Sequence, residues 1–296
     1  MSNRLDKELL KGAIDIHVHS GPSPFHRHHT NEVVQNALDY GLRALFLKKH
    51  HLNTSDRVHY VTREIPGIDV FSSVTLNYAV GGINPFAVDA GLKFGIKKVW
   101  GPTIDSFKQK EFYGSLGGYG AVMNVEKPEC YKNATGIYIL DEKGELIPEM
   151  KEILKMIAAN DIIMGSGHLT WPELIALVKG AKKAGAKLVI DHPHLDFINL
   201  SIEQQKEVAA EGAYLNYCFS EITPKWNNIT VKELAKQIRE IGSEHIVMSS
   251  DLGQVHNSYP AEGLRVYIQV LLEEGITADE IDLMLRKNPA KLVYNE

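Results

Sequence analysis

The chain has 296 residues, of which 44% are hydrophobic and 23% charged, and its formal net charge at pH 7 is -5. This composition supports a large apolar core and excludes a disordered or fibrous protein. The acidic balance excludes the basic surface by which proteins bind nucleic acid or anionic membranes, so we expect a small-molecule partner. The composition is compatible with a homo-oligomer.

The two cysteines, Cys130 and Cys218, form no CxxC pair and can make at most one disulfide, which excludes a disulfide scaffold. The N-terminus carries no apolar signal segment, and no run of about 18 apolar residues occurs along the chain. We therefore expect a cytoplasmic protein with reduced thiols and no membrane-spanning segment.

Eight short runs of β-branched and other apolar residues predict strands at 13–17, 44–48, 70–76, 98–101, 162–167, 187–191, 213–217 and 246–250. Most of the segments between them are amphipathic and carry helix start and stop signals. Ser201 with Gln204 and Thr277 with Glu280 fit capping boxes, and Gly185 is placed to end a helix. The alternation predicts an α/β fold, a (β/α)8 TIM barrel formed by residues 1–296 as a single domain.

The interval after the fourth predicted strand is roughly twice as long as the others, which predicts an insertion at about residues 104–148. Its first part, KEFYGSLGGYGAVMN, is rich in glycine and tyrosine, and its second part, GIYILDEKGELIPEM, predicts a hairpin that turns at 142–144. A long loop here is typical of a lid or binding element, and a surface ornament fits the sequence equally well.

The first predicted strand carries two histidines one residue apart, in the sequence IDIHVHS at 14–20. Because side chains alternate along a strand, His17 and His19 point the same way, roughly 6.5 Å apart, and can bind one ion. The carboxyl end of this strand would lie at the barrel mouth, where α/β barrels have their active sites.

Polar side chains also end or follow four other predicted strands. Burying such groups without partners costs several kcal/mol each, and a shared metal ion would satisfy them together. These residues are Lys48, His168, His192 and Asp251.

The order of these residues resembles that in the amidohydrolase superfamily of metal-dependent TIM-barrel hydrolases: HxH after the first strand, one histidine after the fifth, one after the sixth and an aspartate after the eighth. The resemblance covers nearly the whole chain and includes the closing stretch TADEIDLMLRKNPAKLV. It implies that His17, His19 and Asp251 bind a first metal ion and that Asp251 also takes a proton from the attacking water. It further implies that His168 and His192 bind a second ion.

Two-metal members of that superfamily often use a carboxylated lysine from the fourth strand as a bridge, whereas here that strand reads KKVWGPTID, without a lysine at its carboxyl end. Lys48 or Lys49, at the end of the second strand, is the available substitute, because a desolvated lysine supplies the neutral amine that carboxylation needs. We therefore expect one or two divalent ions, zinc first, with Mn, Fe or Ni as alternatives.

Four further residues are candidates for substrate binding at the mouth. Arg27, in the loop GPSPFHRHHT, suits an anionic substrate group, and a solvated loop explains it as well. His50 shares a strand face with Lys48. Asn77 ends the third predicted strand, and Thr103 follows the fourth.

Together these residues predict an enzyme, a metal-dependent hydrolase that activates water for attack on an amide, lactam, ester or lactone bond of a small molecule. A PHP-type phosphoesterase has a similar opening motif, but its later motif requires a histidine where this chain has Gly253. A barrel that binds metal or ligand without turnover is a second alternative, and a lyase or decarboxylase on the same scaffold is a third.

Overall fold

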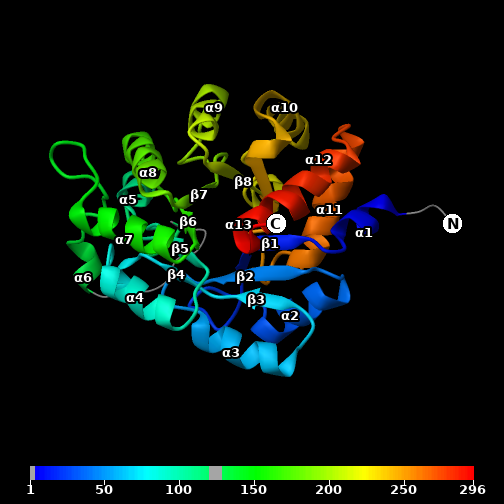
Figure 1. Cartoon of the computed structure of the whole chain (residues 1–296), viewed down its shortest axis with the longest axis horizontal. Helices are drawn as coiled ribbons and strands as arrows, with labels where there is room; N and C mark the ends of the chain where they lie inside the picture. Colours follow the sequence, from blue (N-terminus) through cyan, green and yellow to red (C-terminus); the bar gives the residue numbers. More distant parts are fainter. Residues whose placement is uncertain (1–3, 120–128) are drawn as a thin grey trace.

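Parallel strands run through the centre of the molecule, and helices surround them (Figure 1). The structure is a computed structural model that describes residues 4–119 and 129–296. Its sheets have the orders β1-β2-β3 and β4-β5-β6-β7-β8-β9, and every neighbouring pair is parallel. The strands are β1 (Ile14–His19), β2 (Ala44–Lys48), β3 (Asp69–Phe71), β4 (Ser73–Thr75), β5 (Lys98–Trp100), β6 (Ile163–Gly165), β7 (Lys187–Asp191), β8 (Tyr214–Cys218) and β9 (Ile246–Ser249).

The two sheets join into one ring. Only Ser72 separates β3 from β4, which are two halves of the third predicted strand. At the other seam, the amide of His19 donates to the carbonyl oxygen of Leu252 and the amide of Asp251 donates to that of His17, both at 2.8 Å. These bonds join β1 to the chain that follows β9. The predicted α/β fold of parallel strands is therefore confirmed.

Helices cover the outside of the ring, and their ends follow local sequence signals. The capping boxes of Ser201 with Gln204 and of Thr277 with Glu280 are both present. Gly185 ends its helix in the left-handed region, with a φ of 74°. The helices are α1 (Leu5–Leu10), α2 (Thr30–Asp39), α3 (Ser55–Glu64), α4 (Pro85–Lys93), α7 (Pro148–Ala159), α8 (Trp171–Ala184), α9 (Ile202–Ala210), α10 (Val231–Ile241), α11 (Pro260–Glu273), α12 (Ala278–Asp282) and α13 (Asn288–Tyr294).

The amino-terminal end of the barrel is apolar and is closed by α13. Side chains of Ile14, Phe46 and Val247 form one buried cluster there with Ala290 and Leu292 of that helix. A larger apolar cluster fills the space between the ring and the outer helices. Polar side chains inside the ring are therefore confined to its middle and its carboxyl end.

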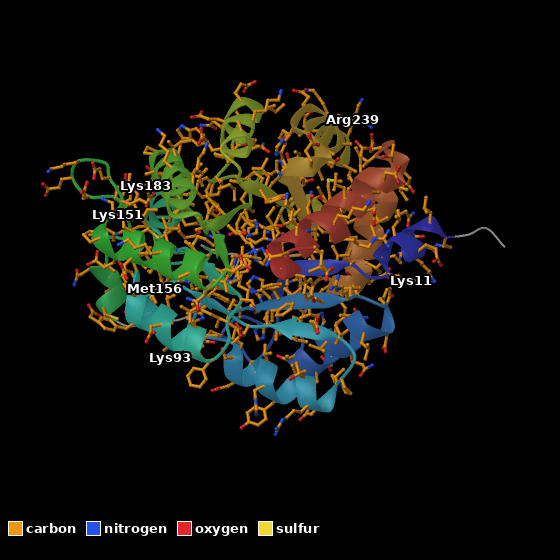
Figure 2. All side chains as sticks on the ribbon, in the orientation of Figure 1. Lys11, Lys93, Lys151, Met156, Lys183 and Arg239 are labelled. Atoms are coloured by element: carbon orange, nitrogen blue, oxygen red, sulfur yellow. The ribbon has the colours of Figure 1, made fainter. Side chains whose placement is uncertain are left out.

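Charged side chains lie on the outer faces of the helices, as Figure 2 shows for the exposed residues Lys93, Lys183 and Arg239. Within residues 4–119 and 129–296, no helix has the length and apolar character needed to cross a bilayer. Cys130 is exposed, Cys218 is buried, and both are free thiols.

The longest connection between successive strands runs from β5 to β6. It contains α5 (Phe107–Tyr113), α6 (Glu129–Lys132) and a hairpin in which Leu140 and Leu146 pair antiparallel. The predicted hairpin is thus confirmed. Residues 120–128 of the predicted 104–148 insertion, which include the end of its glycine- and tyrosine-rich part, lie outside the described residues.

Gly253 lets the chain after β9 cross directly against β1. Its φ is 126°, and a Cβ at this position would collide with the carbonyl oxygen of His19. Gly144, in the exposed hairpin, also has a positive φ of 76°, but a Cβ there would meet nothing within 4 Å. Both glycines have a positive φ, and they differ in the space around them.

We expect Gly253→Ala to lower the free energy of unfolding by about 1–3 kcal/mol more than Gly144→Ala does, because both substitutions strain a positive φ and only the first overpacks the backbone. Urea denaturation of the two variants measures the difference. Equal losses would contradict the close crossing of Gly253 over β1.

Candidate metal centre

Polar residues from the carboxyl ends of several strands meet at one point in the barrel mouth. Oδ1 of Asp251 lies 3.1 Å from Nε2 of His17 and 3.0 Å from Nε2 of His19. One donor atom from each of these residues lies within 4.8 Å of the other two. The structure thus brings together the three residues that the amidohydrolase resemblance assigns to a first metal ion.

The backbone at the strand ends turns these side chains into the mouth. His192 and Asp251 follow β7 and β9 and have positive φ values of 57° and 49°. Such values are uncommon for residues other than glycine and cluster at functional sites. Oδ1 of the buried Asp15 accepts the amides of His17 and Ser250, both at 3.1 Å, and so holds β1 against the segment that carries Asp251.

Lys48, His168 and His192 surround the same centre. Nζ of Lys48 lies 3.0 Å from Nε2 of His17, and the ring centroids of His168 and His192 are 5.5 Å apart. Nδ1 of His168 lies 3.2 Å from Oε1 of Gln109, while its buried Nε2 has no hydrogen-bond partner among the described residues. An unpaired buried imidazole nitrogen is a donor for which a cation would be a partner.

Burial favours the neutral form of the His17 and His19 imidazoles. It lowers the pKa of His19 to about 4 and the pKa of His17 well below its ordinary value. For Asp251, burial acts to raise the pKa, but the hydrogen bond from His19 and the neighbouring His192 bring it below its ordinary value. Neutral imidazoles and a carboxylate are ligands that zinc-like cations prefer, so these residues fit a divalent ion.

A buried carboxylate that the sequence analysis missed lies behind His192. Oε1 of Glu221 is 3.6 Å from Nδ1 of His192, and its Oε2 is 2.9 Å from Nδ1 of His194. Nε2 of His194 in turn lies 3.1 Å from Oε1 of Gln237. Metal-binding histidines commonly direct their second nitrogen toward a carboxylate that fixes the ring. The signal for Glu221 in the sequence is its place just after a strand end, in CFSEI.

A small cavity lies at the centre. Its volume is about 20 Å³, which is room for one water molecule. Arg27 and His50, two of the predicted substrate-binding residues, line it, whereas the half-buried Lys49 does not. Of the two lysines considered as a bridge, only Lys48 therefore lies at the centre. The lining residues are His19, Arg27, Lys48, His50, Tyr119, His192, Leu195, Trp226, Asp251 and Gln254.

Asn77 and Thr103, the other two predicted substrate-binding residues, lie buried behind His50. Oγ1 of Thr103 is 3.0 Å from Nδ1 of His50. Nδ2 of Asn77 donates to that hydroxyl at 2.8 Å and to the carbonyl oxygen of His50 at 2.9 Å. Both residues orient His50, and neither is among the residues that line the cavity.

Solved structures share this fold. An amidohydrolase from Pseudomonas aeruginosa matches with a TM-score of 0.65 and 12% identity over 99% of this chain and 98% of that chain. The probable dipeptidase PvdM from the same organism matches with a TM-score of 0.67 and 12% identity over 97% of this chain and 96% of that chain. The phosphotriesterase homology protein from Escherichia coli matches with a TM-score of 0.56 and 13% identity over 95% of this chain and 98% of that chain. The predicted likeness to amidohydrolase-superfamily barrels is confirmed at the level of the fold.

Residues 12–216 match the family described as "Family of unknown function (DUF6282)". This match covers more than half of the chain, which therefore belongs to that family. No curated protein matches the sequence.

We expect Glu221→Gln to weaken zinc binding by about 10–100-fold, because the amide cannot hold His192 as the carboxylate does. Calorimetric titration of EDTA-treated protein with zinc measures the affinity. Glu142→Gln, in the exposed hairpin turn, is the matched control and should bind zinc as the wild type does. Equal zinc affinities of the two variants would show that Glu221 does not support metal binding at this centre.

The metal-free protein should lose stability as the pH falls. The pKa of His19 is about 4 in the folded chain against an ordinary value of 6.5, so its contribution is complete above pH 6.5 and is lost toward pH 4. Each buried histidine that takes a proton only on unfolding costs about 1.4 kcal/mol per pH unit in that interval. His17, His50 and His168 act in the same direction.

Asp15 has the opposite effect, because burial raises its pKa to about 7 and the folded chain therefore gains stability from this group as the pH falls. It is one group, whereas several histidines lower the stability. Urea unfolding of EDTA-treated protein at about pH 7 and about pH 5 tests the balance. A protein that is equally or more stable at the lower pH would show that these imidazoles are not buried in the neutral form.

Proposed function

We propose that this protein is a metal-dependent hydrolase of small molecules. The observation that carries the proposal is the meeting of two neutral imidazoles, His17 and His19, with the carboxylate of Asp251. They lie at the carboxyl ends of barrel strands, where α/β barrels have their active sites. The fold likeness to an amidohydrolase and a dipeptidase supports the class, and the site supplies the chemistry.

His17, His19 and Asp251 would hold a first divalent ion, zinc in preference to Mn, Fe or Ni. When bound, such an ion lowers the pKa of water from 15.7 toward ~7 and polarises the bond under attack. A second ion would use His168 and His192, with a carboxylated Lys48 as the bridge. Burial lowers the pKa of Lys48, which favours the neutral amine that carboxylation needs.

Asp251 is the proposed general base. Its Oδ2 accepts a hydrogen bond from Oγ of Ser220 at 2.8 Å, while its Oδ1 faces the two histidines. The carboxylate is thereby fixed in the cavity wall, where it takes a proton from the attacking water and passes it to the leaving group.

Arg27 would bind an anionic group of the substrate. Arg27 lines the cavity, and the one hydrogen bond of its side chain within the described residues is a long one, 3.4 Å, to the carbonyl oxygen of His26. No ion pair with Arg27 occurs in that part of the chain. A guanidinium with free donors binds carboxylate or phosphate in a bidentate manner. His50 would contact the substrate, held in place by Asn77 and Thr103.

We also propose that residues 1–296 act as one domain and that 104–148 is an insertion which completes the site. Tyr119 from this segment lines the cavity, and Gln109 contacts His168. The substrate would be an amide, lactam, ester or lactone that carries an acidic group.

A screen of the zinc-loaded protein against lactones, cyclic amides and phosphoesters tests the proposal. For the substrate found, Asp251→Asn should lower kcat/KM by about 10²–10⁴-fold, because the amide cannot accept the proton of water. Metal content is measured in parallel, since Asp251 is also a proposed ligand. Asp196→Asn, an exposed position in the loop after β7, is the control and should keep full activity.

Turnover that survives in the metal-loaded Asp251→Asn variant would rule out Asp251 as the base. Metal binding without turnover of any compound in the screen would favour a non-catalytic barrel. Turnover confined to phosphoesters would favour the phosphoesterase alternative.

A further inference from the structure

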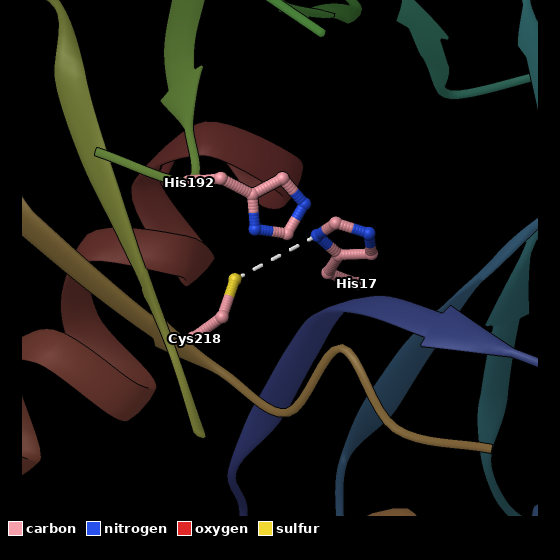
Figure 3. Close-up of side chains that lie close together, drawn as sticks. All are labelled: His17, His192 and Cys218. Atoms are coloured by element: carbon pink, nitrogen blue, oxygen red, sulfur yellow. Dashed lines mark hydrogen bonds between the residues drawn. The ribbon is translucent and has the colours of Figure 1, made fainter. Parts of the chain in front are cut away.

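The imidazole of His17 has polar neighbours on both of its ring nitrogens. Nε2 faces the carboxylate of Asp251 at 3.1 Å. Nδ1 lies 3.2 Å from Nδ2 of Asn216 and also faces Cys218, the last residue of β8, whose Sγ lies 3.8 Å away (Figure 3). The sulfur therefore lies on the side of the ring opposite the candidate hydrolytic centre.

His192 completes a group of three donors around this sulfur. One donor atom each from His17, His192 and Cys218 lies within 4.8 Å of the other two. Figure 3 shows the ring of His192 with one nitrogen on the side of the Cys218 sulfur. The side chain of His192 is 3% exposed, and its Nδ1 has no hydrogen-bond partner among the described residues, although Oε1 of Glu221 lies 3.6 Å from it.

The spacing suits a shared ion. Bonds of about 2.0–2.1 Å to nitrogen and about 2.3 Å to sulfur put N and S roughly 3.5 Å apart in a tetrahedral zinc site. The observed 3.8 Å needs only a small contraction. The other contacts of Sγ, with Oγ of Ser249 at 3.3 Å and the carbonyl oxygen of Asn216 at 3.8 Å, are those of a weak donor.

We propose that His17, through Nδ1, together with His192 and Cys218, forms a second, sulfur-containing position for a thiophilic divalent cation such as Zn²⁺ or Co²⁺. Binding replaces the S–H bond of Cys218 by a metal–sulfur bond and releases the proton to solvent, with no change of oxidation state. Of the three donors, His192 lines the cavity, whereas Cys218 and His17 do not.

An ion in this position would take His17 and His192 away from the candidate hydrolytic centre. The inference does not require that hydrolysis occurs, because it rests on the three donors alone. If the proposed function is also correct, an excess of thiophilic metal inhibits the enzyme and Cys218→Ser relieves the inhibition.

Cobalt binding tests the proposal. EDTA-treated protein is titrated with excess Co²⁺, and the near-ultraviolet sulfur-to-cobalt charge-transfer absorption is recorded. We expect this band in the wild type and in Cys130→Ser, whose target is the exposed cysteine, and its complete loss in Cys218→Ser. Circular dichroism confirms that the variants are folded.

X-ray absorption of the zinc-loaded wild type gives a second reading that needs no variant. We expect a sulfur shell at about 2.3 Å beside the nitrogen and oxygen shell at about 2.0 Å. A shell of nitrogen and oxygen only, a wild type without the band, or a band that persists in Cys218→Ser would overturn the proposal. Metal-dependent turnover alongside any of these results would leave the proposed hydrolase standing.

Discussion

The structure depends on satisfying polar side chains that closure of the barrel buries together. His17 and Asp251 are far apart in sequence, yet 3.1 Å apart in space, because β1 and the chain after β9 are neighbours in the ring. An imidazole or a carboxylate removed from water costs several kcal/mol if it has no partner. Closure of the barrel buries these polar groups. Their contacts with each other, or with a shared cation, offset the free-energy cost of that burial, so the barrel closes only with these groups brought together.

The same constraint explains a polar layer between this centre and the apolar end of the barrel. Lys98 is fully buried, 3.8 Å from Oδ1 of Asp191 and 3.5 Å from the ring centroid of Trp100. Oδ2 of Asp191 accepts the amide of Gly167 at 3.2 Å, and its Oδ1 accepts the side-chain amide of Asn216 at 3.3 Å. A buried ion pair adds little net stability but is costly to break. It therefore holds the strands that carry His168, His192 and Cys218 in a fixed register.

Local patterns predict the strands, the capping boxes and the paired histidines of this chain, because each is set by neighbours in sequence. The end of β1 is not predictable in this way, because Val18 and His19 are held by pairing with β2 after a shift in register. Glu221 and Cys218 are missed for a related reason. A single carboxylate or thiol after a strand does not by itself indicate a metal site, because its partners come from other strands. The place of Asn77 at a strand end predicts a residue that faces the substrate, whereas its side-chain amide donates to the hydroxyl of Thr103 and accepts from the backbone amide of Thr103.

Under the proposed hydrolase function, the fold and the polar centre leave the choice of substrate to the side chains that line the cavity. An amidohydrolase, a dipeptidase and a phosphotriesterase homologue share this fold with the chain at 12–13% identity. Here Tyr119 and Trp226 line a cavity of about 20 Å³, and their ring centroids are 5.6 Å apart. The ring of Tyr119 also packs against those of Phe25 and His50. A ligand larger than water would therefore have to displace part of this aromatic cluster, while the residues beneath it stay where closure of the barrel holds them.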